Sequence, residues 1–337
     1  MGKLAGQIQI GRNRISMVDK PYVIAEIGSN HNQEIETAIC LIQTAAKSGA
    51  NAAKFQLFTA DDLVARDHPA RNVVEKATLN VKWVPLLINE CKKFNLDFLC
   101  STFGLNEFKE LENYEVEAHK IASSEILNTE LLIAAGKSTK PVLLSTGMTD
   151  WFEIEIAVEQ VLSTGNNKII PLHCSSKYPL ETELSNLLVI KKLQDRFGGI
   201  SGFSDHTESV ETGGWAVILG ARVMEKHLTL DRGQEGPDHS YALEPGEFQK
   251  YVSNIQDSFL ALGDGEISYL PEEIIGRRRT SVFAKRYLEI GQVITSEDVE
   301  CRGPRKGIPG NLLYMVIGQK VSRFIASGEV IQWNDLG

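Results

Sequence analysis

Short apolar runs alternate with longer segments of helical periodicity along most of the chain, and this alternation constrains the fold more than any other feature. The segments between the runs carry apolar residues at helical spacing, as Ala38, Leu41, Ile42 and Ala45 do. Strand–helix pairs repeated over about 240 residues, close to the typical ~250, predict an α/β fold of the (β/α)8 TIM-barrel class. The predicted strands span 22–28, 52–57, 97–103, 118–125, 141–147, 169–176, 199–206 and 221–228.

A doubly wound open sheet is the rival architecture for such an alternation. That fold usually carries a glycine-rich, phosphate-binding turn directly after its first strand. The segment Glu26-Ile27-Gly28-Ser29-Asn30 is not a turn of that kind. The sequence therefore favours the closed barrel.

The pattern changes after the last predicted barrel helix, at 245–262, and becomes one of short strands and tight turns. We predict a catalytic barrel with a short N-terminal extension at 1–265, a linker at 266–279 and a small β-rich domain at 280–337. A domain this small is only marginally stable alone, and we expect it to pack against a barrel or a second subunit. It contains a pseudo-repeat in which Gly291, Val293, Ile294, Asp298 and Val299 match Gly328, Val330, Ile331, Asp335 and Leu336.

Charge and cysteine usage argue against several classes of partner and compartment. The formal net charge of −9 argues against nucleic acid and anionic membrane as partners, because both favour basic surfaces. Five cysteines, odd in number and never in a C-x-x-C pair, fit reduced thiols. No apolar run approaches the roughly 18 residues of a membrane span, and no signal peptide is evident. We expect a cytoplasmic protein.

Polar residues stand at the carboxyl end of every predicted strand, which is the active-site face of this barrel class. Taken singly, a strand lysine is often a snorkelling residue and a strand-end serine a turn former. Burying polar groups at all eight strand ends, however, costs desolvation energy, which a bound ligand or pairing among these groups would offset. In chain order these residues are Glu26; Lys54 and Gln56; Thr102; Lys120, Ser123 and Glu125; Ser145 and Thr146; Ser175 and Ser176; Ser204, Asp205 and His206; Glu225 and His227.

The residue types in this ring fit an anionic substrate and a divalent metal. Lys54 and Lys120 supply positive charge for a phosphate or carboxylate, and the serines supply donors around it. A lone histidine is more often structural than a ligand. His206 and His227, however, follow successive strands, with Asp205 and Glu225 nearby. Two imidazoles would leave positions open for water and substrate, as a catalytic ion requires.

Several segments of the chain resemble those of the sialic acid synthase family, and the resemblance covers nearly everything after residue 20. The tail with its Gly-x-Val-Ile repeat resembles the antifreeze-like (SAF) domain of that family. The matching barrel segments are Glu26-Ile-Gly-Ser-Asn-His31, Lys54-Phe-Gln56, Lys120-Ile-Ala-Ser123-Ser-Glu125, Ser145-Thr-Gly147-Met148, His173-Cys-Ser-Ser-Lys-Tyr178-Pro179, Ser204-Asp-His206-Thr, Glu225-Lys-His227 and Gly236-Pro237-Asp238.

The resemblance implies a barrel joined to an antifreeze-like domain in a domain-swapped homodimer, where that domain caps the partner's active site. It assigns a Mn²⁺ or Mg²⁺ ion to His206 and His227, and places Glu225 among the substrate-binding residues. Lys54, Lys120, Ser123, Ser145, Ser176 and Ser204 would hold phosphoenolpyruvate, and Glu26, Gln56, Thr102, Glu125, Tyr178 and Asp238 would face the amino sugar.

This sequence departs from the family pattern at two places. Ser176 stands where bacterial members tend to have asparagine. The segment from Arg302 to Pro309, with Arg305 inside it, replaces a plainer Arg-Pro-Gly-x-Gly whose arginine reaches the partner's sugar. Either Arg302 or Arg305 is therefore expected to fill that role.

The implied activity is a nonulosonic acid synthase, which condenses phosphoenolpyruvate with an N-acetylated amino-sugar aldehyde to give a nine-carbon 2-keto acid and phosphate. The acceptor would be N-acetylmannosamine or a diacetamido analogue. His206 and His227 would act through the metal, and either Glu26 or Glu125 would transfer protons. Lys54-Phe55-Gln56 leans towards the sialic and legionaminic types.

Four alternative functions remain at this point. A pseudaminate-type synthase differs only in its sugar. A synthase of shorter keto-deoxy sugar acids would lack the tail and would need more basic residues. A metal-dependent hydrolase on the same barrel would show His-x-His near the first strand's end, and this chain does not. A non-catalytic sugar- or ice-binding protein is suggested only by the tail.

Overall fold

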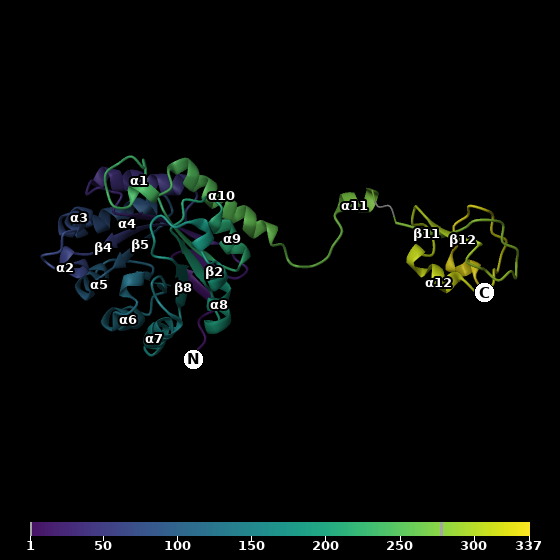
Figure 1. The fold of residues 1–337 in the computed structure, drawn as a ribbon, viewed down its shortest axis with the longest axis horizontal. Coiled ribbons are helices and arrows are strands. Elements are labelled where there is room, and N and C mark those ends of the chain that lie inside the picture. The colour runs from purple at the N-terminus through teal and green to yellow at the C-terminus, as the bar shows by residue number, and fades with distance from the viewer. Residues whose placement is uncertain (1, 277–278) are drawn as a thin grey trace. The chain divides into compact units, whose positions relative to one another are not determined.

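A computed structural model of the chain describes residues 2–276 and 279–337, so Arg277 and Arg278 of the predicted linker lie outside the described residues. The chain forms two compact units, Met1–Asp264 and Gly265–Gly337. Figure 1 shows helices surrounding strands in the first unit and a small β-rich fold in the second. A short helix, α11 (Pro271–Gly276), precedes that fold.

The first unit is a closed parallel barrel, and the predicted fold class is confirmed. Its strands follow one another around the ring in chain order, and β10 pairs with β3 to close it. The fourth predicted strand is shorter than expected because Ser123–Glu125 turns away as a 3-10 helix. The strands are β3 (Tyr22–Gly28), β4 (Ala52–Leu57), β5 (Asp97–Thr102), β6 (His119–Ile121), β7 (Val142–Ser145), β8 (Ile169–Cys174), β9 (Gly202–Asp205) and β10 (Val223–His227).

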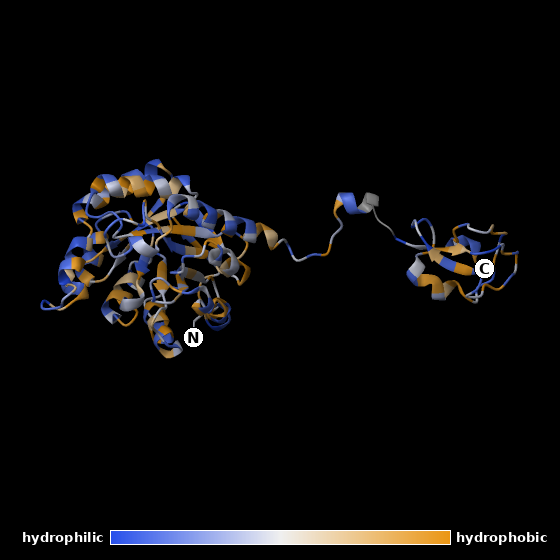
Figure 2. Cartoon of the chain, turned by 45° about the horizontal axis from the view of Figure 1, so that its top comes forward, coloured by the Kyte–Doolittle hydropathy of each residue, from blue (hydrophilic) through white to orange (hydrophobic). Residues whose placement is uncertain are grey.

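Amphipathic helices cover the outside of the barrel. Their buried faces pack on the strands, and Figure 2 shows both hydrophilic and hydrophobic stretches along them. No helix in the described parts of the chain has the length and apolarity to cross a membrane. The main helices are α1 (Ile35–Lys47), α4 (Val84–Lys93), α5 (Leu105–Leu111), α6 (Thr129–Lys137), α7 (Trp151–Leu162), α8 (Leu188–Phe197), α9 (Thr212–Ile218) and α10 (Pro245–Ala261), with α2 (Ala60–Leu63) and α3 (Arg71–Ala77) in the loop after β4.

An antiparallel hairpin, β1 (Gln7–Ile10) and β2 (Asn13–Ser16), precedes the barrel and was not predicted. Its isoleucines, Ile8, Ile10 and Ile15, join a buried cluster with residues that begin the barrel strands. This hydrophobic plug occupies the amino end of the barrel. The polar residues are consequently left to the opposite end. The alternating isoleucines around Gly11, whose φ is +51°, were the signal for this hairpin.

The second unit is built on the predicted pseudo-repeat. It contains β11 (Ser281–Ala284), β12 (Val299–Arg302) and the short helix α12 (Leu313–Val316) around its own hydrophobic core. Two equivalent ion pairs mark the repeat, since Arg286 Nε lies 2.5 Å from Asp298 Oδ1 and Arg323 Nε lies 2.6 Å from Asp335 Oδ1. The repeat in sequence is therefore also a repeat in structure.

Candidate active site

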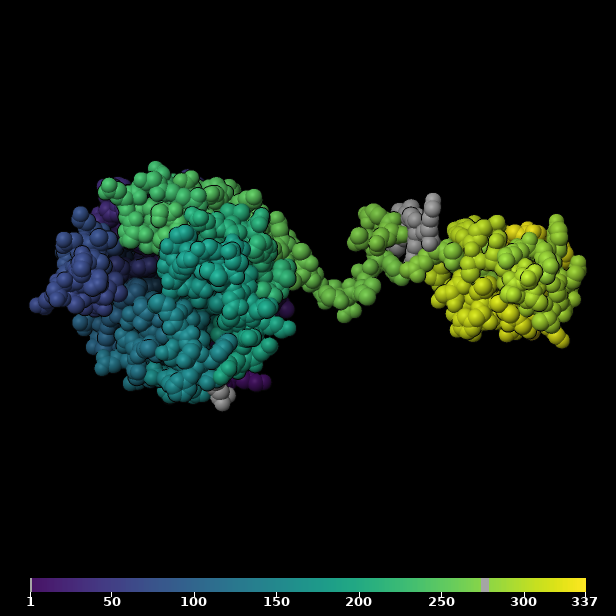
Figure 3. Space-filling model, viewed as in Figure 1, coloured from purple at the N-terminus to yellow at the C-terminus, as the bar shows by residue number. Residues whose placement is uncertain are grey.

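A cavity of about 510 Å³ lies at the carboxyl ends of the barrel strands. Figure 3 shows a hollow near the middle of the barrel unit, between segments coloured blue, teal and green. The shared cavity expected from the strand ends is present. The predicted site residues that line it are Glu26, Lys54, Gln56, Lys120, Ser123, Ser145, Ser176, Tyr178, Ser204, His206, Glu225, His227 and Asp238.

Four predicted site residues do not line this cavity. Side chains alternate along a strand, and on β5 it is Ser101 that faces inward, so Thr102 faces the helices. Glu125 lies in the 3-10 turn after β6, where its Oε2 accepts a hydrogen bond of 3.0 Å from Asn128. Arg302 and Arg305 belong to the second unit. Their proposed roles stay predictions.

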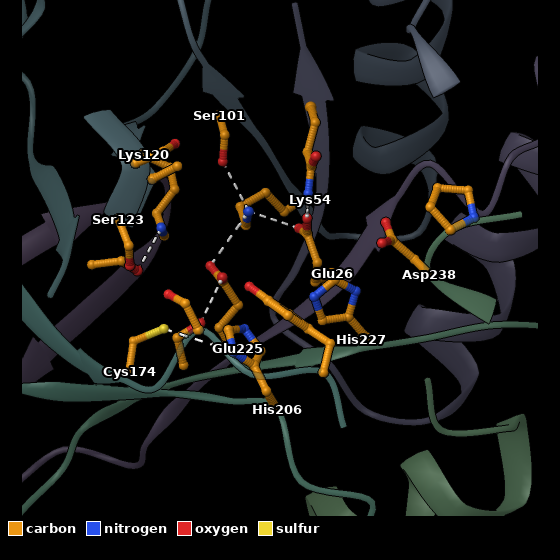
Figure 4. A pocket seen from close by; sticks show the side chains of 18 of the residues that line it. Glu26, Lys54, Ser101, Lys120, Ser123, Cys174, His206, Glu225, His227 and Asp238 are labelled. Carbon is orange, nitrogen blue, oxygen red and sulfur yellow. Dashed lines mark hydrogen bonds and ion pairs between the residues drawn. The ribbon is translucent and has the colours of Figure 1, made fainter. Parts of the chain in front are cut away.

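Lys54 is the centre of the polar network in the cavity. Its Nζ lies 2.7 Å from Glu26 Oε2 and 3.6 Å from Glu225 Oε2, and all three side chains are buried. The ammonium group also donates to Ser101 Oγ at 2.9 Å. Figure 4 shows Lys54 between the two carboxylates. One cation thus holds two acids together inside the barrel.

The two carboxylates differ in their electrostatic environment. Burial raises the pKa of Glu26 to about 7, although Lys54 opposes this shift. Burial also disfavours the charged form of Glu225, but Lys120 and Lys54 outweigh it and hold the pKa of Glu225 at about 2. Ser204 Oγ further donates to Glu225 Oε1 at 3.0 Å. Glu225 is therefore the fixed charge and Glu26 the group that exchanges a proton near neutral pH.

Lys120 lies on the other side of the cavity in a different setting. Its buried Nζ donates to Ser145 Oγ at 2.7 Å and to the Ile121 carbonyl at 3.1 Å. Within the described residues no carboxylate comes within ion-pair distance of it, although the more distant charge of Glu225 opposes the effect of burial on the pKa of this lysine. Burial lowers the pKa of Lys120. An unpaired buried ammonium is a strong attractor for an anionic ligand.

Beside Lys120, small residues form a cradle of hydroxyl groups. Gly147 N–H donates to Ser123 Oγ at 2.9 Å. A Cβ atom at Gly147 would lie 2.4 Å from Ser176 Oγ, 2.9 Å from Ser123 Oγ and 3.2 Å from Cys174 Sγ. A side chain at position 147 would therefore crowd these three side chains, and glycine keeps this part of the cavity open.

The two candidate metal ligands are neighbours at the cavity wall. The ring centroids of His206 and His227 lie 5.6 Å apart, and Tyr178 packs against both, at 4.0 Å and 6.0 Å. His206 Nδ1 is 2.7 Å from the Ser175 carbonyl, which fixes that ring. Burial lowers the pKa of His227 to about 4, and its Nδ1 has no hydrogen-bond partner among the described residues.

These histidines fit an open metal site, completed by water or substrate, and not a closed structural site. In the described part of the chain, no group of three or more His, Cys, Asp or Glu side chains is placed to hold a metal ion. A closed structural site is therefore not formed. A neutral, orphaned imidazole beside a second imidazole does fit an ion that takes its other ligands from water or substrate.

Asp205 was expected beside the histidines, and the structure corrects this. It lies on the outer side of β9, where its Oδ2 is 3.1 Å from Lys226 Nζ. Thr212 donates to the same carboxylate, and Lys226 also donates to the Thr207 carbonyl. Alternation along the strand is again the reason: His206 follows Asp205, His227 follows Lys226, and both histidines face inward.

Sequence reasoning missed several residues that line the cavity. Ser101 could have been found by following the inward parity of Leu99 along the same strand. No sequence pattern pointed to Tyr241, because it lies in a 3-10 turn (His239–Tyr241) that is separated in sequence from the end of β10 at His227. The missed residues are Ser101, Phe103, Ala122, Ser124, Met148, Cys174, Pro237, Ser240 and Tyr241.

Two family models match the chain. The NeuB family model covers residues 41–267, and the SAF domain model covers residues 279–337. The chain belongs to the NeuB family. The resemblance found in the sequence is thus confirmed for the barrel and for the tail.

Known proteins are similar to the chain over most of its length. A Methanocaldococcus jannaschii protein, uncharacterized protein MJ1065, is 34% identical over 98% of both chains. The N,N'-diacetyllegionaminic acid synthase of Campylobacter jejuni is 33% identical, over 93% of this chain and 99% of its own. The crystal structure of the N-acetylneuraminic acid synthetase of Leptospira borgpetersenii, in complex with citrate, is 33% identical with a TM-score of 0.77, over 82% of this chain and 96% of its own.

The ion pair between Asp205 and Lys226, on the outer side of β9 and β10, gives a test of what stabilises the strands that carry both histidines. Replacing Lys226 with methionine should lower the free energy of unfolding by about 3–5 kcal/mol, because Asp205 would stay buried without its partner. Urea unfolding followed by circular dichroism measures this. Lys93→Met is the control, since Lys93 pairs with Glu90 at 2.7 Å but is 64% exposed and should change little. Equal effects of the two substitutions would contradict the structural role.

Proposed function

We propose that this protein is a nonulosonic acid synthase. It condenses phosphoenolpyruvate with an N-acetylated amino sugar in its aldehyde form, and releases a nine-carbon 2-keto acid and inorganic phosphate. The observation that carries the proposal is the unpaired buried Lys120 at one end of a cavity whose centre holds Lys54 between Glu26 and Glu225. Membership of the NeuB family and the similar legionaminic and sialic acid synthases support it.

The Lys120 end of the cavity suits phosphoenolpyruvate. Figure 4 shows Lys120 and Ser123 on one side of the cavity and Asp238 on the other. An anion beside Lys120 would supply the charge partner that this ammonium lacks, and the hydroxyls of Ser123 and Ser176 would donate to its oxygens. The phosphate that leaves at the end of the reaction would be stabilised by the same donors.

The Asp238 end then receives the amino sugar. The CH2 carbon of phosphoenolpyruvate uses the electrons of its double bond to form a bond to the aldehyde carbon, and the aldehyde oxygen takes up a proton. Water adds to the carbon that carries the phosphate, which this bond formation leaves electron-deficient, and loses one proton to become a hydroxyl group. The C–O bond to phosphate then breaks, the hydroxyl loses its second proton as the 2-keto group forms, and phosphate takes that proton up. Glu26, with its pKa near 7, is the residue that we assign to proton transfer, at Oε2 beside Lys54. A role for Glu125 stays a prediction.

His206 and His227 are the residues that we propose to hold a divalent ion, Mn²⁺ or Mg²⁺. Such an ion would supply Lewis-acid polarisation of the aldehyde carbonyl. The chain's own contribution is to keep both rings fixed, through the Ser175 carbonyl and the packing of Tyr178. His227 is kept neutral by burial, which is the form that binds a metal.

We further propose a homodimer in which Arg302 or Arg305 of the second unit reaches the amino sugar in the partner's barrel, and a location in the cytoplasm. Both arginines are exposed, as a residue that acts on another chain must be. All five cysteines are free, and Cys91, Cys100 and Cys174 are buried. Reduced buried thiols fit a reducing compartment.

Release of inorganic phosphate tests the activity and the role of Lys120 together. The wild-type protein should release phosphate from phosphoenolpyruvate only when an N-acetylated amino sugar is present. Lys120→Met should raise the KM for phosphoenolpyruvate about 10- to 100-fold, since it removes a charged donor from the anion. The exposed Lys137 on α6 gives the matched control, Lys137→Met. An unchanged KM in Lys120→Met would place phosphoenolpyruvate elsewhere.

Metal binding is tested apart from activity. Titration calorimetry of the chelator-treated protein should show one Mn²⁺ bound per chain, and phosphate release should return with that ion. His206→Ala and His227→Ala should each abolish Mn²⁺ binding and leave the circular dichroism spectrum unchanged. His68→Ala, at an exposed position, is the control. Wild-type affinity for Mn²⁺ in both site variants would remove the metal from the proposed mechanism.

Mixing two impaired variants, assayed at a phosphoenolpyruvate concentration below the raised KM of Lys120→Met, tests the exchange of second units. One chain carries Lys120→Met, and the other carries Arg302→Ala or Arg305→Ala. With exchanged units, a mixed dimer regains one complete site, built from an intact barrel and an intact arginine. Activity should therefore return on mixing and refolding. Without exchange every site keeps one defect, and absence of recovery with both arginine variants would contradict the proposal.

A further inference from the structure

The Asp238 end of the cavity contains a residue to which the sequence pattern assigns no role. Tyr241 lines the cavity, and its side chain is almost fully buried there. Its ring centroid lies 5.1 Å from that of His227 and 5.1 Å from that of Tyr178. The ring thus fills the space between the candidate metal ligands and the loop that carries Asp238.

Tyr241 is held rigidly in this place. Leu243 N–H donates to the His227 carbonyl at 3.0 Å, and Thr229 N–H donates to the Leu243 carbonyl at 3.0 Å. At the other end of the turn, the buried His239 contacts Thr229 Oγ1 at 2.7 Å through Nδ1 and Asn32 Oδ1 at 3.1 Å through Nε2. The 3-10 turn is therefore tied to β10 on one side and to the loop after β3 on the other.

The hydroxyl of Tyr241 fixes the orientation of Asp238. It donates to Asp238 Oδ1 at 2.6 Å, while Ser29 donates to Oδ2 through its N–H at 3.2 Å and its Oγ at 3.0 Å. A carboxylate offers about four lone-pair sites. Oδ2 is fully engaged by Ser29, whereas Oδ1 keeps one site for a donor from a ligand.

We propose that Tyr241 is a specificity-determining residue for the acceptor sugar: its ring limits the room beside Asp238, and its hydroxyl directs the free lone pair of Asp238 Oδ1 to the ligand. This inference rests on the proposed synthase function. The group of the acceptor bound at this end must then carry an O–H or N–H donor and be too small to displace the ring. An amide N–H or a ring hydroxyl meets both conditions.

Two substitutions separate the two parts of this role. Tyr241→Phe keeps the ring and removes only the hydroxyl, so the KM for the acceptor should rise about tenfold while the ranking of acceptors stays the same. Tyr241→Ala opens the cavity. Acceptors with one added methylene should therefore gain about tenfold or more in kcat/KM, relative to the acceptor that the wild-type protein uses best. The KM for phosphoenolpyruvate should stay at the wild-type value in both.

The measurement is phosphate release over a panel of N-acyl amino sugars that differ by one methylene or one hydroxyl. Tyr114→Phe is the control, since it removes a hydroxyl from the outer surface of the barrel unit, 3.5 Å from Glu110. An unchanged acceptor ranking in Tyr241→Ala, or a wild-type KM for the acceptor in Tyr241→Phe, would overturn the assignment. If the wild type released no phosphate with any acceptor, the synthase function itself would fail instead.

Discussion

The ion pairs of Lys54 with Glu26 and Glu225 are the interaction on which the rest of the site depends. Together with Lys120 they place two cations and two acids in one buried cavity, with a net charge of zero when all are ionised. Mutual pairing is what makes such burial tolerable. An anion bound at Lys120 pairs with the one of the two ammonium groups that has no carboxylate of the described residues at ion-pair distance, and the negative charge it brings to the cavity raises the pKa of Glu26 further. Binding of phosphoenolpyruvate would thus keep a proton on the acid that the later steps need.

The barrel makes this arrangement possible because alternate residues of one strand face opposite layers. On β10, Glu225 and His227 point into the cavity, while Lys226 between them points to the helices and pairs with Asp205. One short strand therefore takes part in two buried ion pairs, on its two faces. The outer pair joins β9 to β10 directly beside both histidines. Loss of the outer ion pair would for this reason affect both the packing of the helices on these strands and the positions of the histidines in the site.

The sequence was sufficient for the barrel, for the cavity and for most of its charged groups, because periodic strands and strand-end residues leave a clear pattern. It failed where the pattern is ambiguous by one residue. Ser101, which lines the cavity, was overlooked beside Thr102, which does not, and Asp205 was placed on the wrong face, since strand ends alone do not fix parity. The N-terminal hairpin was missed although its alternating isoleucines were visible. Tyr241 was beyond reach, because a turn held by Thr229 and Asn32 has no periodicity.

The division between strands and loops also separates chemistry from specificity. Glu26, Lys54, Lys120 and Glu225 lie on strands, where the register of the closed sheet fixes their distances. Tyr178, Asp238 and Tyr241, which surround the far end of the cavity, lie outside the strands. Loops can change while the scaffold stays rigid. A barrel of this family can accordingly keep its buried charges on its strands and alter the sugar it accepts by altering loop residues such as Tyr241.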